Sequence, residues 1–583
     1  MTTLTARPDQ YLTVTRAYQP VPLPEGGILI TSDLAGHPGT YRLDSAGSWP
    51  RRVAASSDRM VPVGAAWGGI LMRHDRGGNE TWQLSRLDPA GTLHQLTRDA
   101  AAIHRTPVIG PDRRWAGLSY NPGGQVDFVL GAIDLETGEI DEWASPGGNV
   151  QWAAWHPDGN QAAAIRGLGS GRSEAYIFTR GSRLRQVLPE AHAVPSLLWA
   201  GRRLLAITDL GSEFLGLAEV DQADPSRLLR WLHHPDHDLR CAVPDPEGGR
   251  LAVAVQEGFQ QRLLLVDAES GGVKQEFELP AGVLYSDNVT DAAGQLAWDG
   301  DRLFAAWETP TRPAEIYELF EGKQWTFAGP QLPVVTDPTP VSYSSFDRLE
   351  IPALLFRSGE GPRPTVVSFH GGPESQLVAS FNPIIQFFCA CGFNVLAPNV
   401  RGSSGYGVTY LHLDDRELRW DSVRDGCEAA RYLKREGIAS QTAVTGGSYG
   451  GFMTLATITE DPELWDAAVS VVGIADWHSF FRNTSGWRRA SRTSEYGDPD
   501  LPADSEFLER FNPLRRAHLI RTPLLVLHGR NDPRVPVSEA EQIVAATGAE
   551  LMIFEDEGHG LVRHANRVRG YGRAAEFLVE TLG

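Results

Sequence analysis

The chain has 583 residues, more than one hydrophobic core usually serves, so at least two domains are expected. Hydrophobic residues make up 42% and charged residues 22% of the chain, as in water-soluble globular proteins. The formal net charge of −20 argues against binding to nucleic acid or to an anionic membrane surface.

The cysteines are too few for a disulfide scaffold, and no pair of CxxC motifs indicates zinc. Residues 387–393 are predicted to be an apolar helix end whose thiols fill the core. We therefore expect neither a metal nor a cofactor. The first residues have no apolar signal core, and no run of eighteen apolar residues occurs, so a cytoplasmic protein that does not enter the membrane is predicted. The cysteines are Cys241, Cys389, Cys391 and Cys427.

A unit of short apolar strands that end in an acidic or polar turn recurs through the first 330 residues. Its first six turns are spaced by 41 to 46 residues, about the length of four short strands. Such a sheet cannot bury both faces alone, so neighbouring units stack around an axis as the blades of a β-propeller. Regular spacing disfavours the alternative, a large irregular β-sandwich. The turns lie at Asp44, Asp88, Asp134, Arg180, Asp221, Asp267 and residues 316–323.

A second turn signal recurs in step with the first and predicts an inner hairpin in five of the units. It lies at residues 110–115, 156–159, 199–203, 245–249 and 298–302. We therefore predict a seven-bladed propeller over residues 23–330. Nothing in its turns resembles a catalytic motif, so we interpret it as a scaffold. Residues 1–22 lie outside the repeat and are expected to pack on the other domain.

Residues 331–583 alternate between apolar runs and helical segments, after a strand pair around Asp347. Apolar runs without polar alternation favour strands that are buried on both faces of a parallel sheet. We predict a doubly wound, mostly parallel α/β sheet, whose sites lie at the carboxyl ends of the strands. The runs are 365–369, 393–397, 442–445, 467–472, 523–528 and 550–554; the helical segments include 421–436, 537–547 and 566–582.

Gly446-x-Ser448-x-Gly450 follows one of these runs and precedes helix-favouring residues, which is the nucleophile-elbow pattern. Small residues let the chain turn sharply and hold the serine hydroxyl at the tip of the turn. The helix that follows favours negative charge developing near its N-terminus. Ser448 is therefore the candidate nucleophile.

A serine nucleophile needs a base, and the base needs an acid to hold its tautomer; in this scaffold the chain order is Ser, Asp or Glu, His. Asp532 follows the run that ends at His528, and His559 follows the run that ends at Phe554. The glycines beside His559 suit a mobile loop. Asp556 and Glu557 are interpreted as solvated loop charges.

An oxyanion hole needs two backbone donors. One should be the amide of Tyr449, directly after the nucleophile. The other should come from His370-Gly-Gly-Pro373, after the run at 365–369, and Gly372 is our choice. The alternative for this segment is a simple turn.

With these pieces together, the chain resembles the prolyl oligopeptidase family of serine peptidases over nearly its whole length. The resemblance implies a propeller followed by an α/β-hydrolase domain, a triad of Ser448, Asp532 and His559, and short peptide substrates that enter between the domains. The motifs that carry it are 370–373, 399–407, 446–451, 528–532, 534–536 and 558–560.

Within that family the chain looks closest to the acylaminoacyl peptidases. Prolyl oligopeptidase and dipeptidyl peptidase relatives have a tyrosine at the position of His370, which completes their oxyanion hole. The propeller also contains no convincing pair of glutamates of the kind that grips a free amine in dipeptidyl peptidases. Both departures argue against proline specificity and dipeptidase activity.

For two further groups of residues, the sequence is compatible with a functional role and with a structural one. Arg534 either orients the substrate or braces the loop of His559, and a structural ion pair is an equal alternative. Val472, Trp477 and Phe481 either line an apolar specificity pocket or pack in the core.

The favoured function is a serine peptidase that releases N-acylated amino acids or cuts short peptides. The alternatives are a carboxylesterase and a non-catalytic propeller scaffold; a homo-oligomer is compatible with each.

Overall fold

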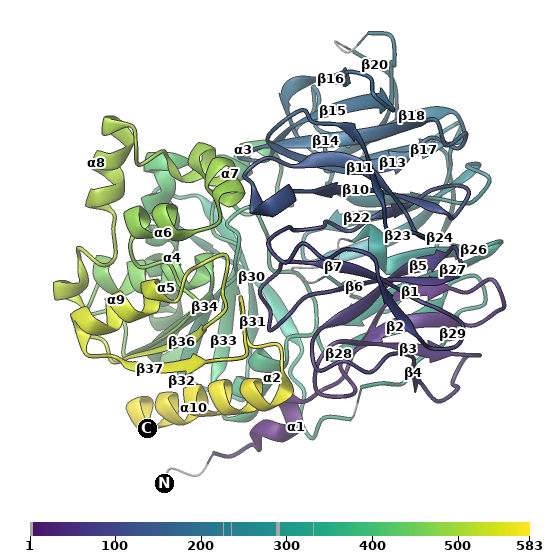
Figure 1. The fold of residues 1–583 in the computed structure, drawn as a ribbon. Helices are drawn as coiled ribbons and strands as arrows, with labels where there is room; N and C mark the ends of the chain where they lie inside the picture. Colours follow the sequence, from purple (N-terminus) through teal and green to yellow (C-terminus); the bar gives the residue numbers. More distant parts are fainter. Residues whose placement is uncertain (1–3, 225–226, 235, 287–291, 330) are drawn as a thin grey trace.

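The computed structural model describes residues 4–224, 227–234, 236–286, 292–329 and 331–583. These residues form seven small antiparallel sheets and one eight-stranded sheet. Figure 1 shows the small sheets arranged as a propeller beside a layered α/β domain, with both chain ends at the α/β domain. The predicted seven-bladed propeller followed by an α/β-hydrolase domain is confirmed. No helix in the described ranges is long and apolar enough to cross a bilayer.

Each blade is built from one continuous stretch of chain. The first four blades contain β1 (Ala17–Pro22), β2 (Ile28–Ser32), β3 (Gly39–Leu43), β4 (Arg51–Arg52); β5 (Met60–Ala66), β6 (Gly69–His74), β7 (Gln83–Leu87), β8 (Leu93–Gln95); β9 (Val108–Ile109), β10 (Trp115–Tyr120), β11 (Val129–Asp134), β12 (Ile140–Ala144); and β13 (Asn149–Trp155), β14 (Gln161–Gly169), β15 (Arg172–Thr179), β16 (Arg185–His192). The last three contain β17 (Ser196–Ala200), β18 (Arg203–Thr208), β19 (Gly216–Val220), β20 (Leu228–His233); β21 (Leu239–Pro244), β22 (Arg250–Glu257), β23 (Gln260–Asp267), β24 (Val273–Glu276); and β25 (Val283–Leu284), β26 (Leu296–Asp299), β27 (Arg302–Thr309), β28 (Arg312–Glu318), β29 (Lys323–Gln324).

The acidic turns that revealed the repeat close the hairpin between the third and fourth strands. Asp134 Oδ1 accepts from the backbone N–H of Glu136 at 2.8 Å, and Asp267 Oδ1 accepts from that of Ser270 at 2.8 Å. An aspartate at this place caps the turn with its own side chain, which is why the acid recurs. The inner turns at 156–159 and 245–249 likewise join the first two strands of their blades.

The propeller begins earlier than expected. β1 pairs with β2 and packs against β27 and β28 of the seventh blade, so it closes the ring. The expected start at residue 23 is therefore too late, because this strand precedes the first acidic turn by which the repeat was recognised. The helix α1 (Pro8–Leu12) packs on the α/β domain, where Tyr11 donates to the carbonyl of Val334 at 3.1 Å. The expected domain end at residue 330 falls outside the described residues.

The α/β domain has a single large sheet with strand order β30-β31-β33-β32-β34-β35-β36-β37, parallel from β33 onward. Successive residues of β34 face opposite layers: Ala443 packs in one cluster of buried side chains and Val444 in the other. The strands are β30 (Pro338–Ser344), β31 (Glu350–Phe356), β32 (Arg363–Phe369), β33 (Asn394–Pro398), β34 (Ala439–Gly447), β35 (Ala467–Val471), β36 (Leu524–Gly529) and β37 (Glu550–Phe554).

Helices cover both faces of this sheet (Figure 1). The apolar segment before residue 393 is a helix, and its thiols Cys389 and Cys391 are buried as predicted. The helices are α2 (Pro383–Ala390), α3 (Val408–Leu411), α4 (Arg419–Arg435), α5 (Tyr449–Glu460), α6 (Trp477–Asn483), α7 (Gly486–Tyr496), α8 (Pro502–Arg510), α9 (Ser538–Thr547) and α10 (His564–Leu582).

Tryptophan packing joins the third and fourth blades. Trp152 on β13 is 1% exposed and lies with Trp143, Trp155 and Phe178 at ring-centroid distances of 4.6 to 5.3 Å. Gly117 on β10 makes room for it, since a Cβ there would lie 2.1 Å from the indole. The contact needs both the large ring and the missing side chain.

Trp152→Ala should lower the free energy of unfolding by about 3–5 kcal/mol, because truncating a buried tryptophan leaves a cavity that the blades cannot close. Trp49→Ala is the matched control, since that side chain is 87% exposed. Denaturant unfolding of both variants measures the difference; equal stability would contradict the interblade role.

Candidate active site

Ser448 lies in a sharp turn between β34 and α5, as predicted. Its backbone has φ 60° and ψ −118°, a strained conformation for a residue with a side chain. A Cβ on Gly446 would lie 2.4 Å from the carbonyl oxygen of Gly450, and one on Gly450 would lie 2.4 Å from that of Phe369. The two glycines are therefore required by the close approach of three backbone segments.

Asp532 and His559 lie in the loops after β36 and β37, and they are hydrogen-bonded. His559 Nδ1 is 2.7 Å from Asp532 Oδ2. The other carboxylate oxygen, Oδ1, accepts from the backbone N–H of Arg534 at 2.8 Å and of Val535 at 3.0 Å. One oxygen therefore holds the loop and the second orients the imidazole.

The three predicted triad residues follow β34, β36 and β37, which lie in the parallel part of one sheet, so all three are placed at its carboxyl edge. Among the described residues Ser448 Oγ has no hydrogen-bond partner. Bonds of this kind commonly tighten only when substrate binds. The contact between Ser448 and His559 stays a prediction.

The loop His370–Pro373 lies against the elbow. A Cβ on Gly371 would be 3.6 Å from Ser448 Cβ, and Gly372 has φ +138°, which favours glycine. The ring nitrogens of His370 lie 2.8 Å from Gly371 O and 2.9 Å from Ser403 Oγ, and burial lowers the pKa of this histidine. The loop is therefore anchored beside Ser448. The amides of Tyr449 and Gly372 remain the predicted oxyanion donors.

The apolar segment after β35 is packed in the core. Val472, Trp477 and Phe481 are 1–3% exposed. Trp477 lies 4.7 Å, between ring centroids, from both Phe452 and Tyr496. Core packing accounts for these three residues in this structure, and a substrate contact by them stays a prediction.

Tyr496, which sequence reasoning missed, connects this aromatic cluster to the loop His370–Pro373. Its hydroxyl lies 3.4 Å from the carbonyl oxygen of Gly372. Nothing in its local sequence distinguishes it, because it comes from the end of α7, more than a hundred residues along the chain.

Arg534 forms an ion pair with the propeller. Its guanidinium lies 2.7 Å from Glu80 Oε1, and the second oxygen of Glu80 lies 2.7 Å from Arg488 of α7. Burial alone would raise the pKa of Glu80, but the guanidiniums of Arg534 and Arg488 outweigh it and lower the pKa to about 2. Glu80 was not predicted, since it lies in an ordinary glycine-rich turn.

The loop of His559 is also fixed by the propeller. A Cβ on Gly558 would lie 2.0 Å from the carbonyl oxygen of Gly78, so the two backbones are in direct contact. Glu557 is 2% exposed and accepts from the backbone N–H of Arg563 at 2.9 Å. Our interpretation of Glu557 as a solvated charge was wrong, because the tertiary fold turns it inward to anchor this loop. Its neighbour Asp556 is exposed.

Glu374 directly follows the loop His370–Pro373 and has one buried oxygen without a hydrogen-bond partner among the described residues. Burial, followed by the nearby charge of Glu495, raises its pKa to about 8, so it is mostly protonated at neutral pH.

In the described part of the chain, no group of three or more His, Cys, Asp or Glu side chains could hold a metal ion.

A nucleophile elbow and an acid–histidine pair on a doubly wound sheet define a hydrolase of the α/β type. The sequence model of the prolyl oligopeptidase family matches residues 379–583, and this part of the chain belongs to that family. It is 32% identical to dipeptidyl aminopeptidase BIII of Pseudoxanthomonas mexicana over 415 residues, which cover 66% of this chain and 58% of that protein. It is 27% identical to the acylamino-acid-releasing enzyme of Homo sapiens over 298 residues, covering 46% and 41%.

The matched regions thus span less than two thirds of these curated relatives. Among solved structures, a puromycin-hydrolysing peptidase of Mycobacterium tuberculosis superposes with a TM-score of 0.85 at 22% identity, covering 100% of this chain and 97% of that one. An acylaminoacyl peptidase of Pyrococcus horikoshii superposes with a TM-score of 0.73 at 18% identity, covering 98% and 97%. These structural likenesses show the shared fold.

Glu80→Gln should lower stability at pH 7 by about 3 kcal/mol, since a pKa lowered from 4.5 to about 2 reflects that much interaction with the charged form. Because the folded-state pKa is the lower one, this contribution is present above pH 4.5 and is lost as the pH falls toward 2.

The measurement is the difference in unfolding free energy between wild type and Glu80→Gln at pH 7, 5 and 3. The exposed Glu321→Gln serves as control. A difference that does not shrink on acidification would contradict the ion-pair account.

Proposed function

We propose that the chain is a serine peptidase that cleaves short peptides through an acyl-enzyme. The observation that carries the proposal is the Asp532–His559 hydrogen bond of 2.7 Å, at the sheet edge where the strained turn of Ser448 lies. The match of residues 379–583 to a peptidase family supports the same reaction.

The mechanism follows from the roles of these groups. His559 accepts the proton of Ser448 Oγ as the oxygen attacks the peptide carbonyl carbon, and Asp532 stabilises the resulting imidazolium. The amides of Tyr449 and Gly372 donate to the oxyanion. His559 then protonates the leaving amine. A water molecule activated by the same imidazole next hydrolyses the ester between the acyl group and Ser448 Oγ, which releases the acid and the free serine.

For the substrate, we propose peptides with a blocked N-terminus, from which an N-acylated amino acid is released. The second possibility is that the enzyme cuts short peptides as an oligopeptidase. A free amine needs a carboxylate to hold it. In the described walls of two interdomain cavities, of about 810 and 610 Å³, the carboxyl groups are Glu80 and Glu374. Glu80 is already held by two guanidiniums, and Glu374 is mostly protonated at neutral pH. Neither is well suited to an ammonium group.

The relatives include both a dipeptidyl aminopeptidase and acylamino-acid-releasing enzymes, so substrate choice has to be measured. A panel of N-acetyl-aminoacyl amides, free-amine dipeptide amides, blocked proline amides and simple esters separates the possibilities. We expect the N-acetyl amides to be cleaved best. Cleavage of esters alone would instead favour a carboxylesterase.

Ser448→Ala should abolish peptide cleavage and labelling by a fluorophosphonate, with a loss of kcat of up to about a millionfold. The reason is that the substitution removes the oxygen that forms the acyl-enzyme. Retained cleavage in this variant would exclude the mechanism, and an unlabelled wild type would support a non-catalytic scaffold.

Asp532→Asn should lower kcat by about 10⁴ with the fold intact, because an amide favours the wrong imidazole tautomer. Asp556→Asn is the matched control, an exposed acid three residues before His559. The measurement is kcat of both variants on one N-acetyl-aminoacyl amide. An equal loss of kcat in the two variants would contradict the role of Asp532 in the triad.

A further inference from the structure

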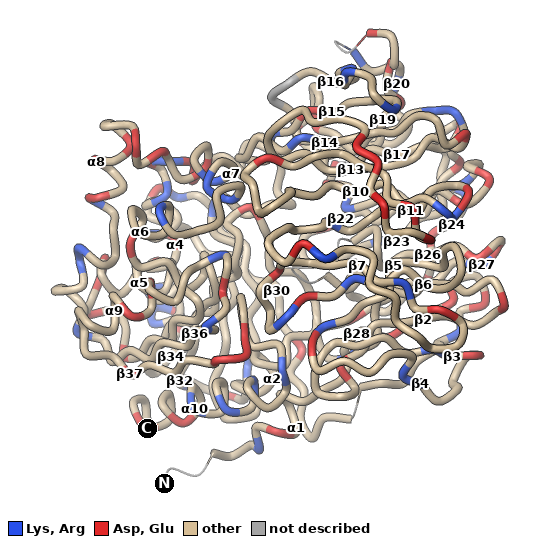
Figure 2. Tube along the Cα trace, viewed as in Figure 1, with Lys and Arg blue, Asp and Glu red and all other residues tan. Residues whose placement is uncertain are grey.

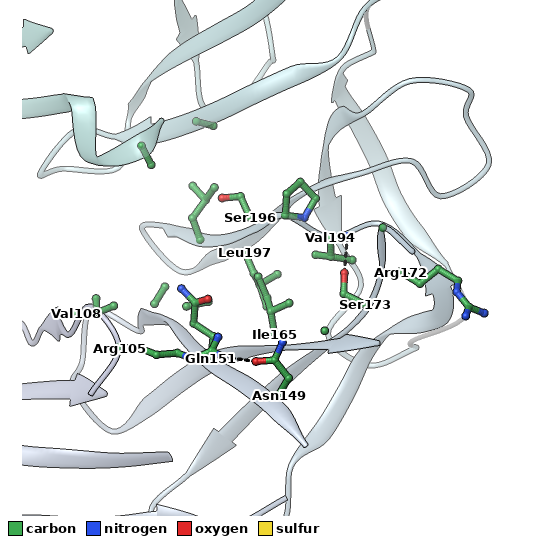
Figure 3. Close-up of a pocket in the computed structure, with 18 of the residues that line it drawn as sticks. Arg105, Val108, Asn149, Gln151, Ile165, Arg172, Ser173, Val194, Ser196 and Leu197 are labelled. Carbon is green, nitrogen blue, oxygen red and sulfur yellow. Dashed lines mark hydrogen bonds between the residues drawn. The ribbon is translucent and has the colours of Figure 1, made fainter. Parts of the chain in front are cut away.

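Two adjoining cavities of about 810 and 610 Å³ connect the propeller axis with the α/β domain. They share Arg105 and Arg488 as lining residues. The walls reach both halves of the candidate site: Glu374 follows the loop His370–Pro373, and Arg534 lies two residues after Asp532. A peptide bound at Ser448 would therefore extend into this space. Figure 3 shows the propeller side of the larger cavity, where Arg105 and Asn149 lie together.

The described walls carry a charge opposite to that of the whole chain. The smaller cavity is lined by four arginines and one glutamate. The larger is lined by four arginines and by Glu374, which is mostly protonated at neutral pH. The chain as a whole has a formal charge of −20, and Figure 2 shows Asp and Glu along the outer turns of both domains. The arginines of the smaller cavity are Arg73, Arg105, Arg488 and Arg534.

Arg73 and Arg105 differ from the other two arginines of the smaller cavity, because neither forms a salt bridge with a described carboxylate. Arg73 donates to Thr106 Oγ1 at 2.7 Å and lies 4.1 Å from the ring centroid of Trp82, while its Nε has no hydrogen-bond partner. Arg105 donates to Asn149 Oδ1 and lies 4.1 Å from the ring centroid of Phe128.

Aromatic rings and neutral oxygens hold these two guanidiniums in place. The charges of Asp75 and Glu80 act on Arg73, but both carboxylates form their salt bridges with other arginines. Burial and the charge of Arg59 lower the pKa of Arg73 to about 9. Burial and the charge of Arg488 lower that of Arg105 to about 10. Both remain charged at neutral pH, and an incoming anion would relieve the cost of burying them.

We propose that the cavity recognises a carboxylate of the bound peptide through Arg73 and Arg105. The carboxylate is either an acidic side chain or the free C-terminus, since both present the same two oxygens to a guanidinium fork. This proposal rests on the proposed peptidase function and names its substrate preference. Because the propeller supplies both arginines, this domain selects substrate as well as bracing the catalytic loops.

The test uses fluorogenic N-acetyl peptides of one sequence, with Gln replaced by Glu at successive positions and with a C-terminal acid or amide. A charged hydrogen bond in a buried site is expected to favour the acid form about tenfold to hundredfold in kcat/KM, through KM. The Glu/Gln pairs report a side-chain carboxylate, and the acid/amide pairs report the C-terminus.

Arg73→Gln and Arg105→Gln should reduce that preference by raising KM for the acidic peptides, with kcat and the neutral peptides little changed. Arg105→Lys keeps the charge without the fork and should retain part of the preference. Arg51→Gln, whose side chain is 64% exposed on the first blade, is the control and should behave as wild type.

Hydrolysis of a small neutral ester and fluorophosphonate labelling report on Ser448 independently. An enzyme that labels and cleaves peptides, yet treats Glu and Gln and acid and amide alike, overturns the carboxylate proposal and leaves the peptidase function standing. An enzyme that neither labels nor cleaves overturns the peptidase function. Calorimetry with Ser448→Ala then decides carboxylate recognition, which requires the acid peptide to bind at least tenfold more tightly than its amide.

Discussion

The hydrogen bond between Asp532 and His559 forms only if the loops after β36 and β37 are held close together. Both the sheet and the propeller contribute to holding them. The parallel order of β34 to β37 brings the ends of the strands to one edge. Asp532 then uses one oxygen to close its own loop and leaves the other for the imidazole. Without that division of the carboxylate, the ring would be free to rotate away from the serine.

The propeller supplies the second half of this constraint. Gly78 touches the backbone of Gly558 directly, and Glu80 bridges Arg534 and Arg488. The loop of His559, which its glycines suggest to be mobile, is thus enclosed by contacts from another domain. A buried carboxylate between two guanidiniums is a costly arrangement if any partner leaves, so separation of the domains at this point would be strongly opposed.

The cavities between the domains are lined mainly by positive charges, whereas the chain as a whole is negatively charged. Asp and Glu residues lie along the outer turns (Figure 2), while several arginines line the two cavities between the domains. Inside such a space, charges are screened less than at the surface, so a few guanidiniums can influence a ligand more than many exposed carboxylates. The net charge of a chain therefore says little about the sign of the field that its substrate meets.

The sequence repeats and motifs were enough to predict the two-domain architecture and the candidate residues Ser448, Asp532 and His559. Asp134 and Asp267 close turns locally, and the glycines around Ser448 are needed by the elbow itself, so these features can be read from short segments. The roles of Glu80, Tyr496 and the arginine-lined cavity were decided only by tertiary structure. Each depends on contacts between segments more than a hundred residues apart, or on burial that changes the energy of a charge. Neither can be recognised in a short stretch of sequence.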